Sequence, residues 1–276
     1  MARDIRPHLL GRTILRANLH KADVLRGIRR PAFERGLGSR RVVAVGRRAK
    51  HVVVELDDGR RMVVQPRMTG SFGVRGAGRG VRKGSRTPRT GDRDPYIVLE
   101  LTLDSGATVF YRDVRRLGAI FLLNEEQWRR YDAAIGPEPL DRSFTAERLA
   151  DILAGGKLAI KKAIMDQRRV AGVGNIYANE ALWMARIDPS RESRRIAPAE
   201  VEALHGAVVE VLRRSIKGRG TTVRDYRTGT GEPGTFQGRL AVYGRAGEQC
   251  LRCGRSVVLT HAIDARATYF CPGCQH

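Results

Sequence analysis

Four cysteines constrain this chain more than any other feature of its 276-residue sequence. They form two Cys-x2-Cys pairs separated by residues 254–270. Each pair sets two thiolates on one side of a tight turn, and two such turns complete a tetrahedron around Zn²⁺ with no position left for water. We therefore predict one structural zinc ion in a C-terminal β-hairpin, with iron or redox-active pairs as the alternatives. The predicted ligands are Cys250, Cys253, Cys271 and Cys274.

The clustering of these cysteines also indicates a compartment. Thiols gathered in one local site do not build a disulfide framework across the chain, which fits a reducing cytoplasm. A hairpin this short buries too little apolar surface to hold together without the ion. We therefore expect loss of zinc to unfold it locally.

The charge of the chain points to a polyanionic partner. Lys and Arg total 51 against 29 Asp and Glu, which gives a formal net charge of +22. Such an excess repels itself unless a polyanion neutralises it, so nucleic acid is the first candidate and an anionic membrane surface the weaker one. A genome rich in G and C would explain Arg in place of Lys, but not the deficit of acids. No apolar run approaches the roughly 18 residues of a membrane span, so we expect no membrane association and no signal peptide.

Residues 39–123 have the pattern of β structure. Alternating or continuous apolar runs flank the turn signals at 57–60 and 104–106, which predicts two hairpins. Between the hairpins, residues 73–95 are rich in Gly and Arg. This basic loop is either a solvated insertion or an arm that contacts DNA. At the start of the chain, the spacing of Ile5, Leu9 and Leu10 predicts one face of an amphipathic helix.

Helical periodicity replaces the β pattern from Asn124 onward. Asn124 is predicted to be an N-cap, Thr145 opens the next helical segment, and two further helices are predicted over 174–186 and 198–217. A Gly- and Thr-rich loop follows at 219–238. The sequence thus predicts an α+β fold with three parts, namely an N-terminal sheet domain (1–130), a helical domain (131–238) and the zinc finger (239–276).

Several segments together resemble formamidopyrimidine-DNA glycosylase over essentially the whole chain. The resemblance implies an N-terminal β-sandwich, a helix–two-turns–helix domain and a C-terminal zinc finger. It also implies a monomeric bacterial repair enzyme that excises oxidised purines, such as 8-oxoguanine and formamidopyrimidines, from double-stranded DNA. The enzyme would then nick the abasic site by β- and δ-elimination. The segments are QPRMTGSF (65–72), YRDVRRLG (111–118), MDQRRVAGVGNIYANEALW (165–183), RGTTVRDY (219–226) and RATYFC (266–271).

The resemblance assigns three residues to the gap that a flipped-out base leaves in the duplex. A lesion inside a duplex is out of reach, so the enzyme must extrude it and fill the space behind it. Met68 resembles the family's wedge methionine, and Arg115 resembles the arginine that faces the orphaned base. Leu117 stands where the family usually has Phe, and leucine still wedges between bases.

Other residues are assigned to phosphates, elimination and the extruded base. Lys50 matches the lysine ascribed to β-elimination, and Arg266 matches the zinc-finger arginine that holds phosphates and is implicated in δ-elimination. Asn175 begins a glycine-rich helix start suited to a phosphate. Lys157 and Lys161 resemble lysines that contact DNA near the lesion. The base-capping loop would be 219–238, with polar contacts from Thr221, Thr222 and Tyr226.

The catalytic nucleophile of the family is an N-terminal proline, followed by an acid/base glutamate, in a segment Pro-Glu-Leu-Pro-Glu-Val-Glu. The opening MARDIRPHLL resembles the residues that come after that segment, so we expect the Pro-Glu pair to be missing from the chain as printed. Lys50 or Lys161 would then be the remaining amines for a weak Schiff base at an abasic site. Two alternatives stay open: a catalytically inactive zinc-dependent protein that binds damaged DNA, and an endonuclease VIII-type glycosylase for oxidised pyrimidines.

Overall fold

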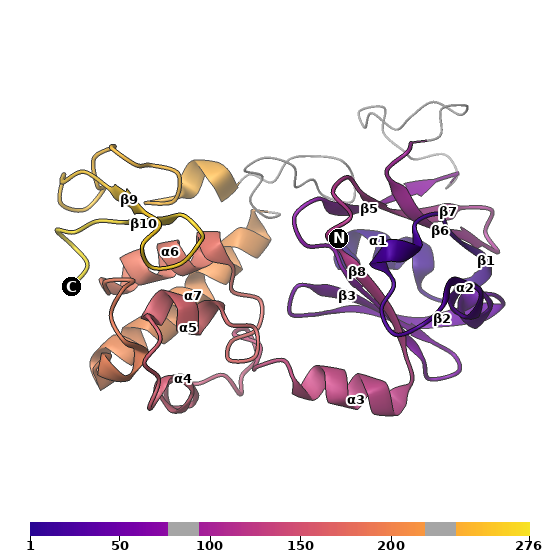
Figure 1. The fold of residues 1–276 in the computed structure, drawn as a ribbon, viewed down its shortest axis with the longest axis horizontal. Helices are drawn as coiled ribbons and strands as arrows, with labels where there is room; N and C mark the ends of the chain where they lie inside the picture. Colours follow the sequence, from indigo (N-terminus) through magenta and orange to yellow (C-terminus); the bar gives the residue numbers. More distant parts are fainter. Residues whose placement is uncertain (77–93, 219–235) are drawn as a thin grey trace. The chain divides into compact units, whose positions relative to one another are not determined.

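The computed structural model describes residues 1–76, 94–218 and 236–276. Its described residues divide into two compact units, the first within 1–132 and the second made of 133–218 and 236–276 (Figure 1). The greater part of the predicted basic loop 73–95 lies outside the described residues. So do the three candidates of the capping loop, Thr221, Thr222 and Tyr226.

The first unit is built on eight strands that pair antiparallel in the order β5-β7-β6-β1-β2-β3-β4-β8. The pairing of β1 with β2 involves just Thr13 with Arg41 and Ile14 with Arg40, so it forms a corner between two halves of the sheet. Apolar side chains from both halves share one core, as in a sandwich. The predicted N-terminal β-sandwich is confirmed. The strands are β1 (Thr13–Leu19), β2 (Arg40–Arg48), β3 (His51–Leu56), β4 (Arg61–Gln65), β5 (Gly70–Arg75), β6 (Ile97–Leu103), β7 (Thr108–Asp113) and β8 (Ala119–Leu123).

Both predicted hairpins are present, β3–β4 and β6–β7. Their turns contain Gly59 and Gly106, whose φ angles of 79° and 77° favour glycine. Strand β1 lies outside the range predicted as β structure. A bulge between Ile14 and Arg16 interrupts its register and its alternation of apolar and polar residues, so the pattern is weak in the sequence.

Three helices accompany the sheet among the described residues of the first unit. Helix α1 (Ala2–Leu9) contacts β2, β5 and β7, with Ile5 and Leu9 buried. The expectation that Leu10 shares this face is wrong, because Leu10 follows the last turn and is 41% exposed. Helix α2 (Arg30–Leu37) follows a short 3-10 turn, η1 (Ala22–Val24). Helix α3 (Glu125–Ala133) begins after Asn124, whose side chain and that of Gln127 each accept the other's backbone N–H.

The second unit is helical and has its own apolar core. The helical segment predicted to open at Thr145 is present as α4 (Ala146–Leu153), and Thr145 caps it by accepting the backbone N–H of Arg148. The helices predicted over 174–186 and 198–217 are present as α6 (Asn175–Ala185) and α7 (Pro198–Lys217). Between α4 and α6 lies the short α5 (Ile160–Met165), and a 3-10 turn, η2 (Ser193–Arg195), precedes α7.

The C-terminal segment of the second unit carries the cysteines. After a 3-10 turn, η3 (Phe236–Arg239), two short strands form an antiparallel hairpin, β9 (Val258–Thr260) and β10 (Thr268–Phe270). The hairpin lies between the two Cys-x2-Cys pairs, and β10 contacts α6. Among the helices that the structure describes, none has the length and apolar character needed to cross a membrane.

Candidate nucleic-acid interface

The predicted gap-filling residues lie on two neighbouring loops of the first unit. Met68 is in the turn before β5, and Arg115 and Leu117 are in the loop after β7. Because Gly70 of β5 pairs with Asp113 of β7, the two loops leave the sheet side by side. Met68 is 66% exposed and Leu117 is 47% exposed, so both apolar side chains face solvent. The structure therefore brings these three predicted residues to one place.

A buried carboxylate joins these two loops. Asp113 has no exposed surface, and its Oδ1 accepts the hydroxyl of Thr69 at 2.5 Å. Its Oδ2 accepts the backbone N–H of Gly118 at 2.8 Å and the hydroxyl of Tyr111 at 3.3 Å. The hydroxyl of Thr69 in turn accepts the backbone N–H of Arg115 at 3.2 Å. Burial and the charge of Asp113 raise the pKa of Tyr111 far above its usual range, so its hydroxyl remains a donor.

Gly118 permits the close approach of this loop to the network. A Cβ atom there would lie 2.3 Å from the Tyr111 hydroxyl and 2.9 Å from both Asp113 Oδ2 and the Gln65 carbonyl. We expect Gly118→Ala to lower the free energy of unfolding by about 1–3 kcal/mol through overpacking. Urea unfolding measures this. The control is Gly46→Ala, whose Cβ would meet no atom within 4 Å. Equal stability of the two variants would contradict the packing described.

Lys50 belongs to the same end of the sheet. It is exposed in the turn between β2 and β3, after Ala49, which has a φ of 51°. The register pairs Val52 with Val64, so β3 begins where β4 ends. It also pairs Gln65 with Ala119, so β8 begins at that end as well. The same end of the strands therefore carries Lys50, the Met68 turn and the loop that ends at Gly118.

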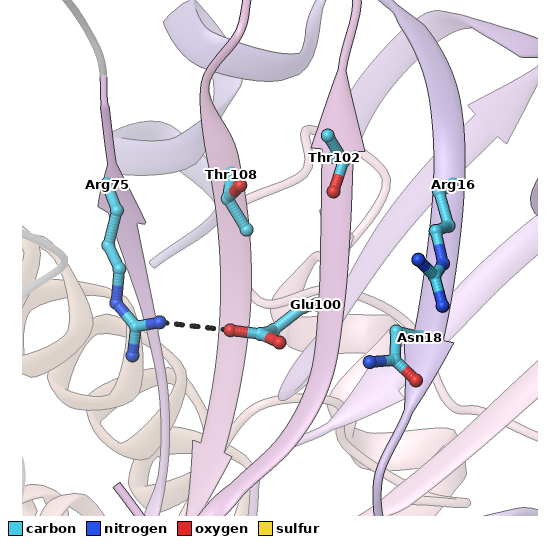
Figure 2. A pocket seen from close by; sticks show the side chains of 6 residues that line it. All are labelled: Arg16, Asn18, Arg75, Glu100, Thr102 and Thr108. Atoms are coloured by element: carbon cyan, nitrogen blue, oxygen red, sulfur yellow. Dashed lines mark hydrogen bonds and ion pairs between the residues drawn. The ribbon is translucent and has the colours of Figure 1, made fainter. Parts of the chain in front are cut away.

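A polar hollow of about 250 Å³ lies elsewhere on the sheet (Figure 2). Arg75, at the opposite end of β5 from Met68, forms an ion pair with Glu100 at 3.0 Å. Glu100 also contacts His20 at 2.8 Å. Since Arg75 and Glu100 offset each other's charge, the hollow is a weaker candidate site than the Met68 end. Its lining residues are Arg16, Asn18, Arg75, Glu100, Thr102 and Thr108.

In the second unit, the turn that carries Arg266 is held by two other predicted residues. The carbonyl of Ala267 accepts hydrogen bonds from Asn175 Nδ2 at 2.9 Å and from Lys161 Nζ at 3.3 Å. The side chain of Arg266 is exposed. Asn175 therefore donates to the zinc-finger chain, and the expected contact of its amide with phosphate stays a prediction. Lys161, Asn175 and Arg266 form one cluster, which was not evident from their separation in the sequence.

Lys161 is completely buried, so in this structure it is not placed to touch DNA or an abasic sugar. Its Nζ donates to Thr268 Oγ1 at 2.7 Å and to the carbonyl of Arg266 at 3.4 Å, and it lies 3.4 Å from Asp264. Burial lowers the pKa of Lys161, and the charge of Asp264 opposes that effect. We therefore reinterpret Lys161 as a support of the Arg266 turn.

Two further positions can reach a phosphate backbone. Helix α6 begins with Gly174 as its N-cap, which has no side chain to cap the first turn, so the positive end of the helix dipole can face an anion there. Lys157 is exposed in the loop between α4 and α5. These placements are compatible with the predicted DNA contacts and do not test them.

The cysteine cluster fits a zinc ion. The four Sγ atoms lie within 4.8 Å of one another, with Cys250 and Cys274 3.9 Å apart and Cys253 and Cys271 3.4 Å apart. Sulfurs bound tetrahedrally at about 2.3 Å from zinc are about 3.8 Å apart. Burial and the neighbouring cysteines raise the pKa of Cys274 to about 12. A cation would offset the repulsion among four thiolates held this closely.

Trp183 and Arg252 support this cluster from α6 and the first cysteine turn. Trp183 Nε1 and the backbone N–H of Arg252 both donate to Cys250 Sγ at 3.5 Å. Burial disfavours the Cys250 thiolate, but these bonds, together with those from the Cys253 backbone and the Cys271 side chain, lower the pKa of Cys250 to about 6. The Arg252 guanidinium lies 4.2 Å from the centre of the Trp183 ring. Such N–H···S bonds orient metal ligands.

Sequence reasoning missed the residues that hold these sites. Asp113, Thr69, Asp264 and Thr268 were not singled out, because each acts on a partner distant in the sequence. Glu180 was missed too, and its buried carboxylate accepts the backbone N–H groups of Ala241, Val242 and Tyr243. A polar residue at an otherwise apolar helix position, as in ANEALW, was the available signal for Glu180.

Comparisons with known proteins agree with this architecture. The family model of the formamidopyrimidine-DNA glycosylase N-terminal domain matches residues 1–120, and that of the formamidopyrimidine-DNA glycosylase H2TH domain matches residues 135–227. The formamidopyrimidine-DNA glycosylase of Roseiflexus sp. is 41% identical over 239 residues, which are 87% of this chain and 83% of that protein. That of Chloroflexus aurantiacus is 37% identical over 277 residues, which cover 100% of this chain and 94% of that protein.

Solved structures show the same fold. The MutM (Fpg) protein of Thermus thermophilus superposes with a TM-score of 0.84 at 33% identity, covering 99% of this chain and 95% of that one. Lactococcus lactis Fpg in complex with DNA containing an abasic site gives 0.87 at 27% identity, covering 100% and 96%. Fold and matches together define a DNA repair glycosylase. The chain belongs to the formamidopyrimidine-DNA glycosylase family.

Proposed function

We propose that this protein excises oxidised purines from double-stranded DNA and nicks the resulting abasic site by β- and δ-elimination. One observation carries the proposal. The loops that contain Met68, Arg115, Leu117 and Lys50 all lie at the same end of the strands. Solved relatives support the partner, since Lactococcus lactis Fpg was crystallised with DNA containing Fapy-dG and with DNA containing an abasic site. The substrate assignment follows family membership.

The exposed side chains would stabilise the DNA with the damaged base extruded. Extrusion of a base costs a few kcal/mol, which contacts in the vacated space offset. Met68 and Leu117 would fill that space with apolar surface, and Arg115 would face the orphaned base. In the second unit, Arg266, Lys157 and the first turn of α6 would bind the phosphates around the lesion.

The covalent step needs an amine at the sugar. In the family this is an N-terminal proline, whose secondary amine attacks C1′ as the bond to the base breaks. The C1′–O4′ bond of the resulting aminal then opens, with the adjacent glutamate supplying the proton that O4′ takes up, and this leaves a Schiff base between the proline nitrogen and C1′. The chain as printed contains no such pair at its start, so the assay must include it. Lys50 would assist β-elimination, and Arg266 would assist δ-elimination at the flanking phosphate.

Borohydride trapping tests this function. Two proteins are compared, namely the chain as printed and the chain preceded by Pro-Glu-Leu-Pro-Glu-Val-Glu and one further residue. We expect the extended chain to be trapped on duplexes containing 8-oxoguanine or an abasic site, and to cut both. An undamaged duplex of the same sequence is the control, and the printed chain should give little or no trapping.

Other outcomes would replace the proposal. Excision of an oxidised pyrimidine in preference to 8-oxoguanine would identify an endonuclease VIII-type specificity, for which the leucine at position 117 is the motivating feature. Binding of the abasic duplex by both proteins without trapping or cutting would identify a damaged-DNA binder. Lys50→Ala in the printed chain shows whether any residual trapping uses that amine.

A further inference from the structure

Asp113 is a fully buried carboxylate to which the proposed reaction assigns no step. A buried charge is expensive unless hydrogen bonds satisfy it. Here three donors do so: the hydroxyls of Thr69 and Tyr111 and the backbone N–H of Gly118. Burial of the carboxylate therefore requires all of these hydrogen bonds in one geometry. Two of the donors, Thr69 and Gly118, belong to the two exposed loops.

Each of the three gap-filling residues either donates a hydrogen bond to this network or directly precedes a residue that does. Met68 directly precedes Thr69, whose hydroxyl donates to Asp113. Arg115 donates its own backbone N–H to that same hydroxyl. Leu117 directly precedes Gly118, whose N–H donates to Asp113. One carboxylate thus fixes the backbone on which all three side chains stand.

Each of the two loops contains a residue other than glycine with a positive φ angle, and each of these residues is next to a gap-filling residue. Arg67, before Met68, has a φ of 48°, and Arg116, between Arg115 and Leu117, has a φ of 51°. Residues other than glycine adopt this left-handed conformation at an energetic cost, and keep it where the surroundings determine it. The Asp113 network supplies such surroundings. It holds the loops in a conformation that they would not keep by themselves.

We propose that Asp113, together with Thr69, is a positioning group that preforms Met68, Arg115 and Leu117 as one rigid unit for insertion into DNA; this rests on the proposed function. Ordering a side chain on binding costs conformational entropy, and a preformed unit avoids that cost. The network should therefore raise affinity for a duplex in which a base position is vacant. Binding to an intact duplex depends on phosphate contacts and does not draw on the network.

The test compares Thr69→Val with Thr69→Ser. Valine keeps the shape of threonine but removes the hydroxyl, which leaves Asp113 Oδ1 without its donor and the Arg115 N–H without its acceptor. Serine keeps the hydroxyl. Dissociation constants are measured for a duplex with an abasic site and for the same duplex undamaged. We expect Thr69→Val to lose about tenfold in affinity for the abasic duplex and less than about twofold for the undamaged one. Thr69→Ser should stay within about twofold of the parent on both.

The outcomes separate the inference from the function on which it rests. A parent protein that does not prefer the abasic duplex would refute the proposed function. A parent that prefers it, with Thr69→Val keeping the full preference, would overturn the inference alone. Hydrogen exchange of the parent gives a second measurement that needs no folded variant. The amides of Arg115 and Gly118 should exchange far more slowly than those of the exposed residues Arg67 and Met68 in the same two loops, and equal rates would also overturn the inference.

Discussion

Cys271→Ser should abolish zinc binding and lower affinity for duplex DNA by at least about 100-fold, or about 2.8 kcal/mol. Cys271 has no exposed surface, and structural zinc contributes about 10–16 kcal/mol to the folding of small zinc domains. Without the ion, the hairpin loses the constraint at both of its ends, and Arg266 is on that hairpin. Zinc content and DNA affinity, measured on the same preparation, test the prediction.

A spectroscopic signal shows where the change occurs. The chain has two tryptophans, and Trp183 donates to Cys250 while Trp128 lies in α3 of the first unit. Chelation should therefore change the fluorescence of a Trp128→Phe protein and leave that of a Trp183→Phe protein unaltered. Leu259→Ser, at an exposed hairpin position, is the matched control and should retain zinc. Normal DNA affinity in metal-free Cys271→Ser protein would contradict a structural role for zinc.

Short-range sequence patterns predicted most of the elements of the fold. The cysteine spacing, the turn glycines of the two hairpins and the helix starts at Asn124 and Thr145 each act within a few residues, so the sequence predicts them directly. Strand β1 was missed because its bulge interrupts the alternation. Helix α2 was missed because few of its eight residues are apolar, and Phe33 and Leu37 reveal its buried face in the structure.

The support of the candidate sites could not be predicted in the same way. Thr69 and Asp113 are 44 residues apart, and Lys161 and Thr268 are 107 residues apart. No local pattern links such pairs, because the strand register and the helix packing bring them together. Family resemblance found the exposed residues together with Lys161 and Asn175, whereas the other buried polar residues that hold these sites became visible in the structure.

Lys161 is the clearest case in which burial changes the meaning of a predicted residue. We expect Lys161→Met to lower the free energy of unfolding of the second unit by about 3 kcal/mol, because it leaves Asp264 without its buried cation and Thr268 without a donor. The Arg266 turn loses its anchor at the same time, so affinity for a damaged duplex should fall as well. Urea unfolding followed by Trp183 fluorescence, in a Trp128→Phe background, measures the stability of this unit.

The neighbouring Lys162 provides a matched control, because it is an exposed lysine on the same short helix. Lys162→Met should change the free energy of unfolding by less than about 0.5 kcal/mol. Asp264→Asn removes the other charge but keeps an acceptor for the backbone N–H of Arg266. If Lys161 and Asp264 act as a pair, the double variant should be less destabilised than the sum of the two single variants. Strict additivity, or a Lys161→Met protein as stable as its Lys162→Met control, would show that the buried ammonium group does not hold this turn.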